Sequence, residues 1–451
     1  MPDYHTPMIA NPVDWKEPVS QEGQKLSVFE EWWSIFHDPI LDELQTKALQ
    51  NSPTLQEAVW QAVEARALAR AARSPLYPSV ALAPSTLNRL SLSNNGGYRT
   101  PHGEPILERV KTTQYTLPVD VFYEFDLWGH LRYGAEAGFA NAQAKQEAWH
   151  TVRLSLTASV AEAYFTLRNL DASTQVLQEA IIVREHAFDI AQSKFDSGLV
   201  NYEDVARAKT ELATAQADMS ETLRLRALEE HLLAFLIGEL PACFCQASFP
   251  LYGCPPHIQP QLPSEVLLRR PDVAEAERRV ATLYAEEGVA YTSLFPSIAI
   301  TTQLGLASPQ LSNLWDWKAR LWTVAWDGFQ TIYDGGLKCA DIAAAKARVH
   351  QAVCQYRNTV LVSFQEVEDA LSNLYWQKHQ QDEWDAAVEA STIAAELAAE
   401  RYDKGLVTYL DVVDARRTLL NAQLNATRAN GNRFLGTVQL AKALGGGWQP
   451  E

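Results

Sequence analysis

The chain has 451 residues, with 38 basic and 55 acidic side chains and a formal net charge of −17. This acidic balance argues against a nucleic-acid partner, because nucleic acids are bound by basic patches. No apolar run approaches the roughly 18 to 20 residues of a membrane-spanning helix, so any contact with a bilayer would require a barrel or a lipid.

The N-terminal region is predicted to be an extended strap over residues 1–35, which are rich in Pro and Trp and show little periodicity. Residues 1–7 lack a basic segment followed by an apolar one, so no signal peptide is expected in the chain as given. Two interpretations stay open. Either the protein is cytoplasmic, or its export signal was removed or lies upstream of the recorded start.

Two helical segments are predicted next, separated at Asn51-Ser52-Pro53. Pro53 suits the first turn of a helix, and residues 54–73 are rich in good helix formers. Pro75 and Pro78 end the second segment.

The clearest strand covers residues 115–127, where every second side chain is apolar or aromatic. The opposite face carries Asp120, Glu124 and Asp126. In a membrane barrel, the apolar face of such a strand meets lipid and the acidic face lines water. In a water-soluble sheet the same acidic face would simply look outward. A second pair of strands is predicted at residues 297–305 and 322–333, with Asp327 inside the latter.

Long helices follow each pair of strands. Seam spacing of the coiled-coil kind is carried by Leu156, Val160, Ala163, Leu167 and Leu170, and later by Val205, Ala208, Leu212, Ala215 and Met219. A helix over about residues 136–195 would be roughly 90 Å long. A plain coiled-coil scaffold is the alternative, but it does not explain why acidic-faced strands interrupt the helices twice.

The sequence is duplicated. Residues 194–205 return as residues 401–412, and the segment from Pro53 to Pro78 resembles that from Pro271 to Pro296. Each half is predicted to contain a helix, two strands, a long helix, a tight turn and another long helix. Four strands cannot close a barrel, for which about eight is the minimum, whereas three chains would supply twelve.

These patterns give the predicted organisation. After the strap come a first repeat at 36–240 (helices 38–74 and 134–238, strands about 79–128), an equatorial connecting loop at 241–262, and a second repeat at 263–447 (helices 271–294 and 336–443, strands about 297–334).

The chain carries no recognisable catalytic or metal-binding motif. HExxH, GxSxG and P-loop patterns are absent from the sequence, so we expect no enzyme, no metal and no cofactor. Three of the five cysteines, Cys243, Cys245 and Cys254, cluster in the connecting loop. A disulfide from Cys254 to either of the others stays open for an oxidising compartment, as do unpaired thiols.

Three motifs resemble those of one family. Residues 32–39 are similar to an opening W-x-x-F-x-D-P, residues 267–272 to an L-R-R-P-D hallmark, and residues 409–417 to a Y-L-D-V-L-D-A-x-R tip. Together they resemble the lipoprotein branch of the TolC/OprM-like outer-membrane efflux channel family. The resemblance covers nearly the whole chain.

That resemblance implies a mainly α protein with a transmembrane β-barrel. Three chains would form a twelve-stranded barrel, with four strands per chain, on a long helical coiled-coil tunnel. The expected location is the Gram-negative outer membrane, extending into the periplasm. The implied partners are a periplasmic adaptor protein, an inner-membrane pump of the resistance-nodulation-division type, and outer-membrane lipid. The implied function is passive exit of small molecules, with type I protein secretion as an alternative and a soluble coiled-coil scaffold as another.

One feature departs from the family pattern. Lipoprotein members carry an acylated N-terminal Cys just before a segment like Pro2-Asp3-Tyr4, whereas Met1 stands there in this chain. An N-terminal lipid is therefore expected only for a native form whose Cys is not present in this sequence.

The resemblance also implies a periplasmic gate. Asp411 and Asp414 lie three residues apart and thus on one helix face, and three copies would form rings of carboxylates that favour cations. The alternative is ordinary solvated or capping acids. Leu410 matches a hydrophobic ring position, and Tyr402 and Asp204 match positions that link helices at the closed mouth. For each of these the alternative is simple packing or capping.

Two hairpin tips and an acidic lumen complete the expected site. The family places adaptor contacts at tips that correspond here to Gly198, Leu199, Val200, Gly405, Leu406 and Val407. The two glycines are expected to supply the positive φ of the turns. In a barrel, Asp120, Glu124, Asp126 and Asp327 would line the lumen.

Overall fold

A computed structural model describes residues 15–16, 24–25, 31–93, 99, 102, 108–259 and 269–446. Most of the predicted strap lies outside the described residues, as do Met1 to Tyr4, Leu267 and Leu268. The chain divides into two compact units. The described residues of the sheet unit fall in 63–143 and 278–354, and those of the helical unit in 7–62, 144–277 and 355–451.

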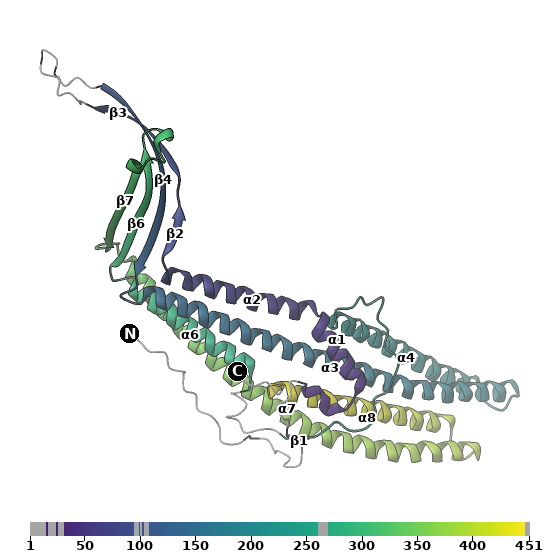
Figure 1. Cartoon of the computed structure of the whole chain (residues 1–451). Helices are drawn as coiled ribbons and strands as arrows, with labels where there is room; N and C mark the ends of the chain where they lie inside the picture. Colours follow the sequence, from purple (N-terminus) through teal and green to yellow (C-terminus); the bar gives the residue numbers. More distant parts are fainter. Residues whose placement is uncertain are drawn as a thin grey trace. The chain divides into compact units, whose positions relative to one another are not determined.

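The sheet unit contains one antiparallel sheet (Figure 1). Its strands are β2 (Ser79–Leu82), β3 (Ser85–Ser93), β4 (Glu108–Phe125), β6 (Ser297–Ser308) and β7 (Arg320–Phe329). β2 and β3 both pair with β4, which pairs with β6, which pairs with β7.

β2 and β3 behave as one strand interrupted at Pro84. Leu82 lies opposite Val119 and Ser85 opposite Thr116, so the register on β4 is continuous. The N–H of Ala83 donates to the carbonyl of Pro118 (3.2 Å), which maintains the ladder where Pro84 has no N–H to offer. The sheet therefore follows four strand paths, as the sequence predicted.

Two strands end earlier than predicted. β4 stops at Phe125 because the carboxylate of Asp126 accepts hydrogen bonds from the N–H groups of Leu131 (3.1 Å) and Arg132 (3.0 Å) and so caps the next helix. β7 stops at Phe329, and Asp334 caps the helix that follows it through the N–H of Gly336 (2.9 Å). The strand predictions for 115–127 and 322–333 were wrong at these ends.

The helices of the described chain are long. They are α1 (Pro39–Asn51), α2 (Pro53–Arg73), α3 (His130–Asp196), α4 (Tyr202–Leu236), α6 (Pro271–Thr292), α7 (Leu337–Asp403) and α8 (Tyr409–Ala443). α3 and α4 form one hairpin and α7 and α8 another (Figure 1). α3 and α7 have 67 residues each and α4 and α8 have 35 each, which matches the duplicated sequence.

None of the helices in the described part of the chain is both long and apolar enough to cross a membrane.

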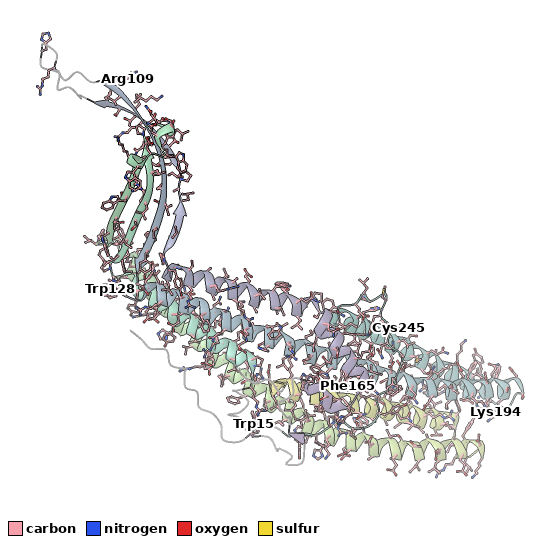
Figure 2. All side chains as sticks on the ribbon, viewed as in Figure 1. Trp15, Arg109, Trp128, Phe165, Lys194 and Cys245 are labelled. Atoms are coloured by element: carbon pink, nitrogen blue, oxygen red, sulfur yellow. The ribbon has the colours of Figure 1, made fainter. Side chains whose placement is uncertain are left out.

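The core of the helical unit centres on Phe165 of α3, which Figure 2 labels. Its ring packs 4.7 Å from that of Phe36 and 5.0 Å from that of Phe434, measured between centroids. The W-x-x-F-x-D-P motif joins this core. Asp38 caps α1 through the N–H of Ile40 (3.1 Å) and accepts a hydrogen bond from the hydroxyl of Tyr164 (2.7 Å). The motif therefore fastens α1 to α3.

The second motif has an equally local role. The buried guanidinium of Arg270 pairs with Asp272 (2.7 Å) and Glu366 (2.6 Å) and donates to the carbonyl of Ala443 (3.1 Å). These contacts tie the start of α6 to α7 and to the end of α8.

Candidate functional site

The two hairpin tips have the same backbone conformation. Gly198 and Gly405 have φ of 72° and 73°, which confirms the predicted positive φ. The N–H of Leu199 donates to Lys194 O (2.9 Å), and the N–H of Leu406 donates to Arg401 O (2.9 Å). These bonds satisfy carbonyls at each helix end and leave the leucine side chains exposed, by 75% at Leu199 and 71% at Leu406.

The neighbouring valines are less open. Val200 and Val407 are half-buried, so the apolar contact surface at each tip is provided mainly by its leucine.

The predicted gate acids lie in the first turns of α8. The carboxylate of Asp411 accepts hydrogen bonds from the N–H (2.9 Å) and the hydroxyl (2.7 Å) of Thr408, so within one chain it caps α8. These donors hold the pKa of Asp411 below its ordinary value. Asp414 is exposed, and Leu410 beside it is half exposed. The ring that these residues would form needs three copies and stays a prediction.

Tyr402 joins the two hairpins by packing. Its ring lies 5.6 Å from that of Tyr409, and the ammonium of Lys194 sits 4.6 Å from its centroid. Figure 2 labels Lys194 near the end of the α3–α4 hairpin. This cation–π contact was not predictable from sequence patterns, because it joins residues distant in the chain.

Asp204 occupies the first turn of α4, where it is half-buried. The hydrogen bonds found among the described residues do not join its carboxylate to Tyr402. The link predicted for these two positions is therefore not formed between them within one chain, and its formation between chains stays a prediction.

An ion cluster that the sequence did not predict connects α3, α4 and α8 at residues away from the hairpin tips. Glu211 of α4 pairs with Arg184 of α3 (3.3 Å) and with Arg417 of α8. The predicted seam on α4 placed Leu212 inside, whereas the structure buries Glu211 and leaves Leu212 half-exposed. The sequence spacing was also compatible with a buried Glu211, because Ala208, Glu211 and Ala215 follow one another at intervals of three and four residues, as seam residues do.

The sheet brings three of the four predicted lumen acids onto one face. Glu124 lies opposite Ala299, which lies opposite Asp327, and Asp120 lies opposite Gln303 on the same alternation. The amide of Gln303 donates to Asp120 (2.9 Å). Asp126 does not belong to this face, because it lies beyond β4 and caps α3. Lining of a lumen by the other three stays a prediction.

The cysteines make no disulfide in this structure. Cys243, Cys245 and Cys254 are exposed free thiols in the connecting loop, and so are Cys339 and Cys354 on α7.

The family model for outer membrane efflux proteins matches residues 44–239 and 262–446. The chain therefore belongs to the outer membrane efflux protein family. The resemblance to TolC/OprM-like channels is confirmed.

Curated relatives match over almost their whole length. The chain is 29% identical over 450 residues to the pyoverdine export outer membrane protein OpmQ of Pseudomonas putida, covering 98% of this chain and 93% of the relative. It is 28% identical to the outer membrane protein OprJ of Pseudomonas aeruginosa, covering 99% and 92%.

Solved structures show the same fold. The outer-membrane channel OprN matches with a TM-score of 0.91 and 28% identity, over 100% of this chain and 99% of that one. The MtrE channel of Neisseria gonorrhoeae, solved in an open state, matches with a TM-score of 0.85 and 26% identity, over 99% and 98%. The predicted TolC-like channel fold, outer-membrane location and role as the channel of an efflux system are confirmed, and the assembly of three chains stays a prediction.

Proposed function

We propose that three copies of this chain assemble into the exit duct of a tripartite pump, through which small molecules leave the cell. The four strand paths of each copy would contribute to a twelve-stranded barrel, and the two hairpins of each copy would contribute to a periplasmic tunnel. The duct makes and breaks no bond.

The observation that carries this proposal is the position of the two hairpin tips relative to the acids. Each hairpin ends in an exposed leucine, and Asp411 and Asp414 begin α8 within a few residues of the second tip. Exposed apolar side chains at a tip suit a protein partner better than solvent. We assign the tips to a periplasmic adaptor and the acids to a cation-favouring mouth.

The partner pump and the cargo are inferred from the relatives of this chain. We propose an inner-membrane pump of the resistance-nodulation-division type, because relatives include toluene and antibiotic efflux proteins. These relatives favour small-molecule efflux over type I protein secretion, and the family favours a membrane channel over a soluble scaffold. The predicted N-terminal lipid concerns residues outside the described range and stays a prediction.

The gate is tested by single-channel conductance in planar bilayers. We expect the wild-type trimer to show a small, cation-selective conductance, and the Asp411→Ala/Asp414→Ala double variant to conduct several-fold more. Asp382→Ala/Asp385→Ala, which removes two acids with the same spacing from α7, is the matched control and should leave conductance unchanged. Equal conductance in the wild type and the gate variant would contradict the assignment of Asp411 and Asp414 as a gate. A wild type that never conducts would contradict the proposed duct.

A further inference from the structure

We propose that the outer end of the sheet carries a cationic rim, formed by Arg109, Lys111 and Arg320, that binds the phosphate groups of outer-leaflet glycolipids. The inference rests on the proposed function, because it requires the apolar face of the sheet to meet lipid. It gives this end of the sheet a ligand of its own, in addition to its part in the wall of the duct.

The two faces of the sheet differ in chemistry. One face carries the three carboxylates described above. On the other face, Val119 of β4 lies opposite Leu304 of β6, and Leu304 lies opposite Trp322 of β7. All three of these apolar side chains are exposed in the single chain. In a membrane barrel the apolar face meets lipid and the acidic face meets water, so the face of Val119 is the lipid-facing side.

The apolar part of this face has the height of a membrane. On β4 it extends from Tyr115 to Phe125, which at the rise of a β-strand is about 34 Å. When the strand is tilted by about 40°, this length covers about 25 Å, the height of the lipid-facing band in outer-membrane barrels. The chain passes from Phe125 into α3, so the end of the band at Tyr115 points away from the helices and is the outer end.

Cations follow where the apolar band ends. Lys111 and Arg109, the latter labelled in Figure 2, continue the alternation of β4 beyond Tyr115 on the lipid-facing side. Arg320, the first residue of β7, lies on the same side, because it is in register with Leu306 and hence with the odd-numbered residues of β4. In a chain with a net charge of −17, three cations at one end of one face are a local concentration of positive charge.

The rim keeps its charge within the chain. The ion pairs formed among the described residues leave all three cations without a carboxylate partner. The guanidinium of Arg320 lies over the ring of Trp317, and an arginine stacked in this way retains the donors at its edge for an anion. Asp316 and Lys318 of the same loop are both exposed, and their opposite charges cancel.

The surroundings of the cations favour a lipid over a free anion. Leu90 of β3 lies opposite Lys111. Leu92 lies opposite Arg109, and both leucines are exposed, as is Trp317. A phosphorylated amphiphile would pair its phosphates with the cations and lay its apolar part on these side chains and on the band below them. Inorganic phosphate would contact the cations alone.

Lipid binding by the full-length trimer tests the rim. The trimer is purified in detergent and titrated with diphosphoryl lipid A, and the bound lipid is counted by native mass spectrometry. We expect Lys111→Gln/Arg320→Gln to weaken binding about tenfold, because it removes two charged phosphate partners. Arg320→Gln alone, which should bind several-fold more weakly than the wild type, is the second variant should the double one assemble poorly. Lys111→Arg/Arg320→Lys, which keeps both charges, should bind nearly as well as the wild type.

The matched control is an arginine on the other face of the same two strands. Arg89 of β3 is exposed and lies opposite Thr112, so it faces away from the lipid-facing side. Arg89→Gln should therefore bind diphosphoryl lipid A like the wild type. Equal weakening by Arg89→Gln and by the double variant would overturn the rim, because it would show a general effect of charge.

Two further probes identify the ligand. We expect dephosphorylated lipid A to bind the wild type as weakly as diphosphoryl lipid A binds the double variant. Inorganic phosphate, at the same concentration of phosphate groups, should not displace diphosphoryl lipid A. Displacement by inorganic phosphate would show a site for free anions, and equal binding of the two lipids would show that phosphate is not recognised. Either result would overturn the proposal.

Conductance of the wild type separates this inference from the proposed function. If the wild-type trimer conducts in planar bilayers while the double variant binds diphosphoryl lipid A as tightly as the wild type, the rim is wrong and the duct stands. If the wild type never conducts, the proposed duct fails, and the rim fails with it because it needs a sheet that faces lipid.

Discussion

At the scale of single residues, charged side chains in two of the family-like motifs hold neighbouring helices together. Asp38 caps α1 and binds α3, and Arg270 joins α6 to α7 and α8. Both are charged groups removed from solvent and fully partnered, an arrangement in which loss of one partner is costly. Their identity therefore reports on the fold of the helical unit, whereas the proposed gate and adaptor-contact residues lie near the tips.

The pH response of Asp411 distinguishes a cap from a ring. Because Thr408 donates two hydrogen bonds, the pKa of Asp411 lies below its ordinary value of 3.8. A lowered pKa contributes stability above the ordinary value, and this is lost as pH falls through the folded value. We therefore expect amide hydrogen exchange over residues 405–412, corrected for intrinsic rates, to show equal protection at pH 7 and pH 5. Thr408→Val, which removes the hydroxyl donor, should lower protection at both.

The opposite result would be informative about the assembly. Carboxylates crowded around a three-fold axis raise one another's pKa. If protection fell between pH 7 and pH 5 in the trimer, that repulsion would outweigh the two donors, and the capping account of Asp411 would be wrong.

At the scale of elements, alternation and turn chemistry were predictable, but the ends of the elements and their partners were not. Period-two alternation separated Asp120, Glu124 and Asp327 from the apolar side chains of their own strands, and the register through β6 brings all three onto one face. Asp126 has the right alternation, yet it caps α3, because a carboxylate at a helix start gains two backbone donors. The seam on α4 was misassigned by one residue, because hydrophobicity favours Leu212 and only the partners Arg184 and Arg417 explain a buried Glu211.

The β4–β6 ladder depends on a glycine opposite a proline. Gly305 lies opposite Pro118, and a Cβ at Gly305 would stand 2.3 Å from the carbonyl oxygen of Leu117 and 2.5 Å from Cα of Pro118. Because both neighbours are backbone atoms, the strands would have to separate. We expect Gly305→Ala to destabilise the sheet by about 1–3 kcal/mol or more. The measurement is the fraction of outer-membrane protein that migrates as a heat-resistant trimer on gels.

Gly328→Ala is the matched control on β7, where an added Cβ would meet no atom within 4 Å. It should assemble like the wild type. Equal trimer yields for both alanine variants would show that the ladder can absorb the extra carbon at Gly305.

At the scale of the whole molecule, the sequence was most informative where one chain repeats itself and least informative where chains must meet. The duplicated sequence predicted two hairpins, and their helices have equal lengths, because each copy carries the same seam spacing and the same Gly-Leu-Val turn. The proposed carboxylate ring, barrel and adaptor contact would depend on other copies or other proteins. Their geometry is therefore not encoded in contacts within one chain.

Substitution of the exposed tip leucines should separate conduction through the channel from its coupling to the rest of the pump. Replacing both exposed tip leucines, Leu199→Ser/Leu406→Ser, should leave trimer yield and bilayer conductance unchanged, since neither side chain is buried in the chain. In cells that express the cognate adaptor and pump, the same variant should accumulate ethidium to the level of cells without the channel, because the adaptor would lose its apolar contact. Leu361→Ser, at a leucine on α7 that is 63% exposed, is the control and should efflux normally. Normal efflux by the tip variant would place the adaptor elsewhere on the helical unit, whereas a loss of conductance would mean that the leucines support the fold.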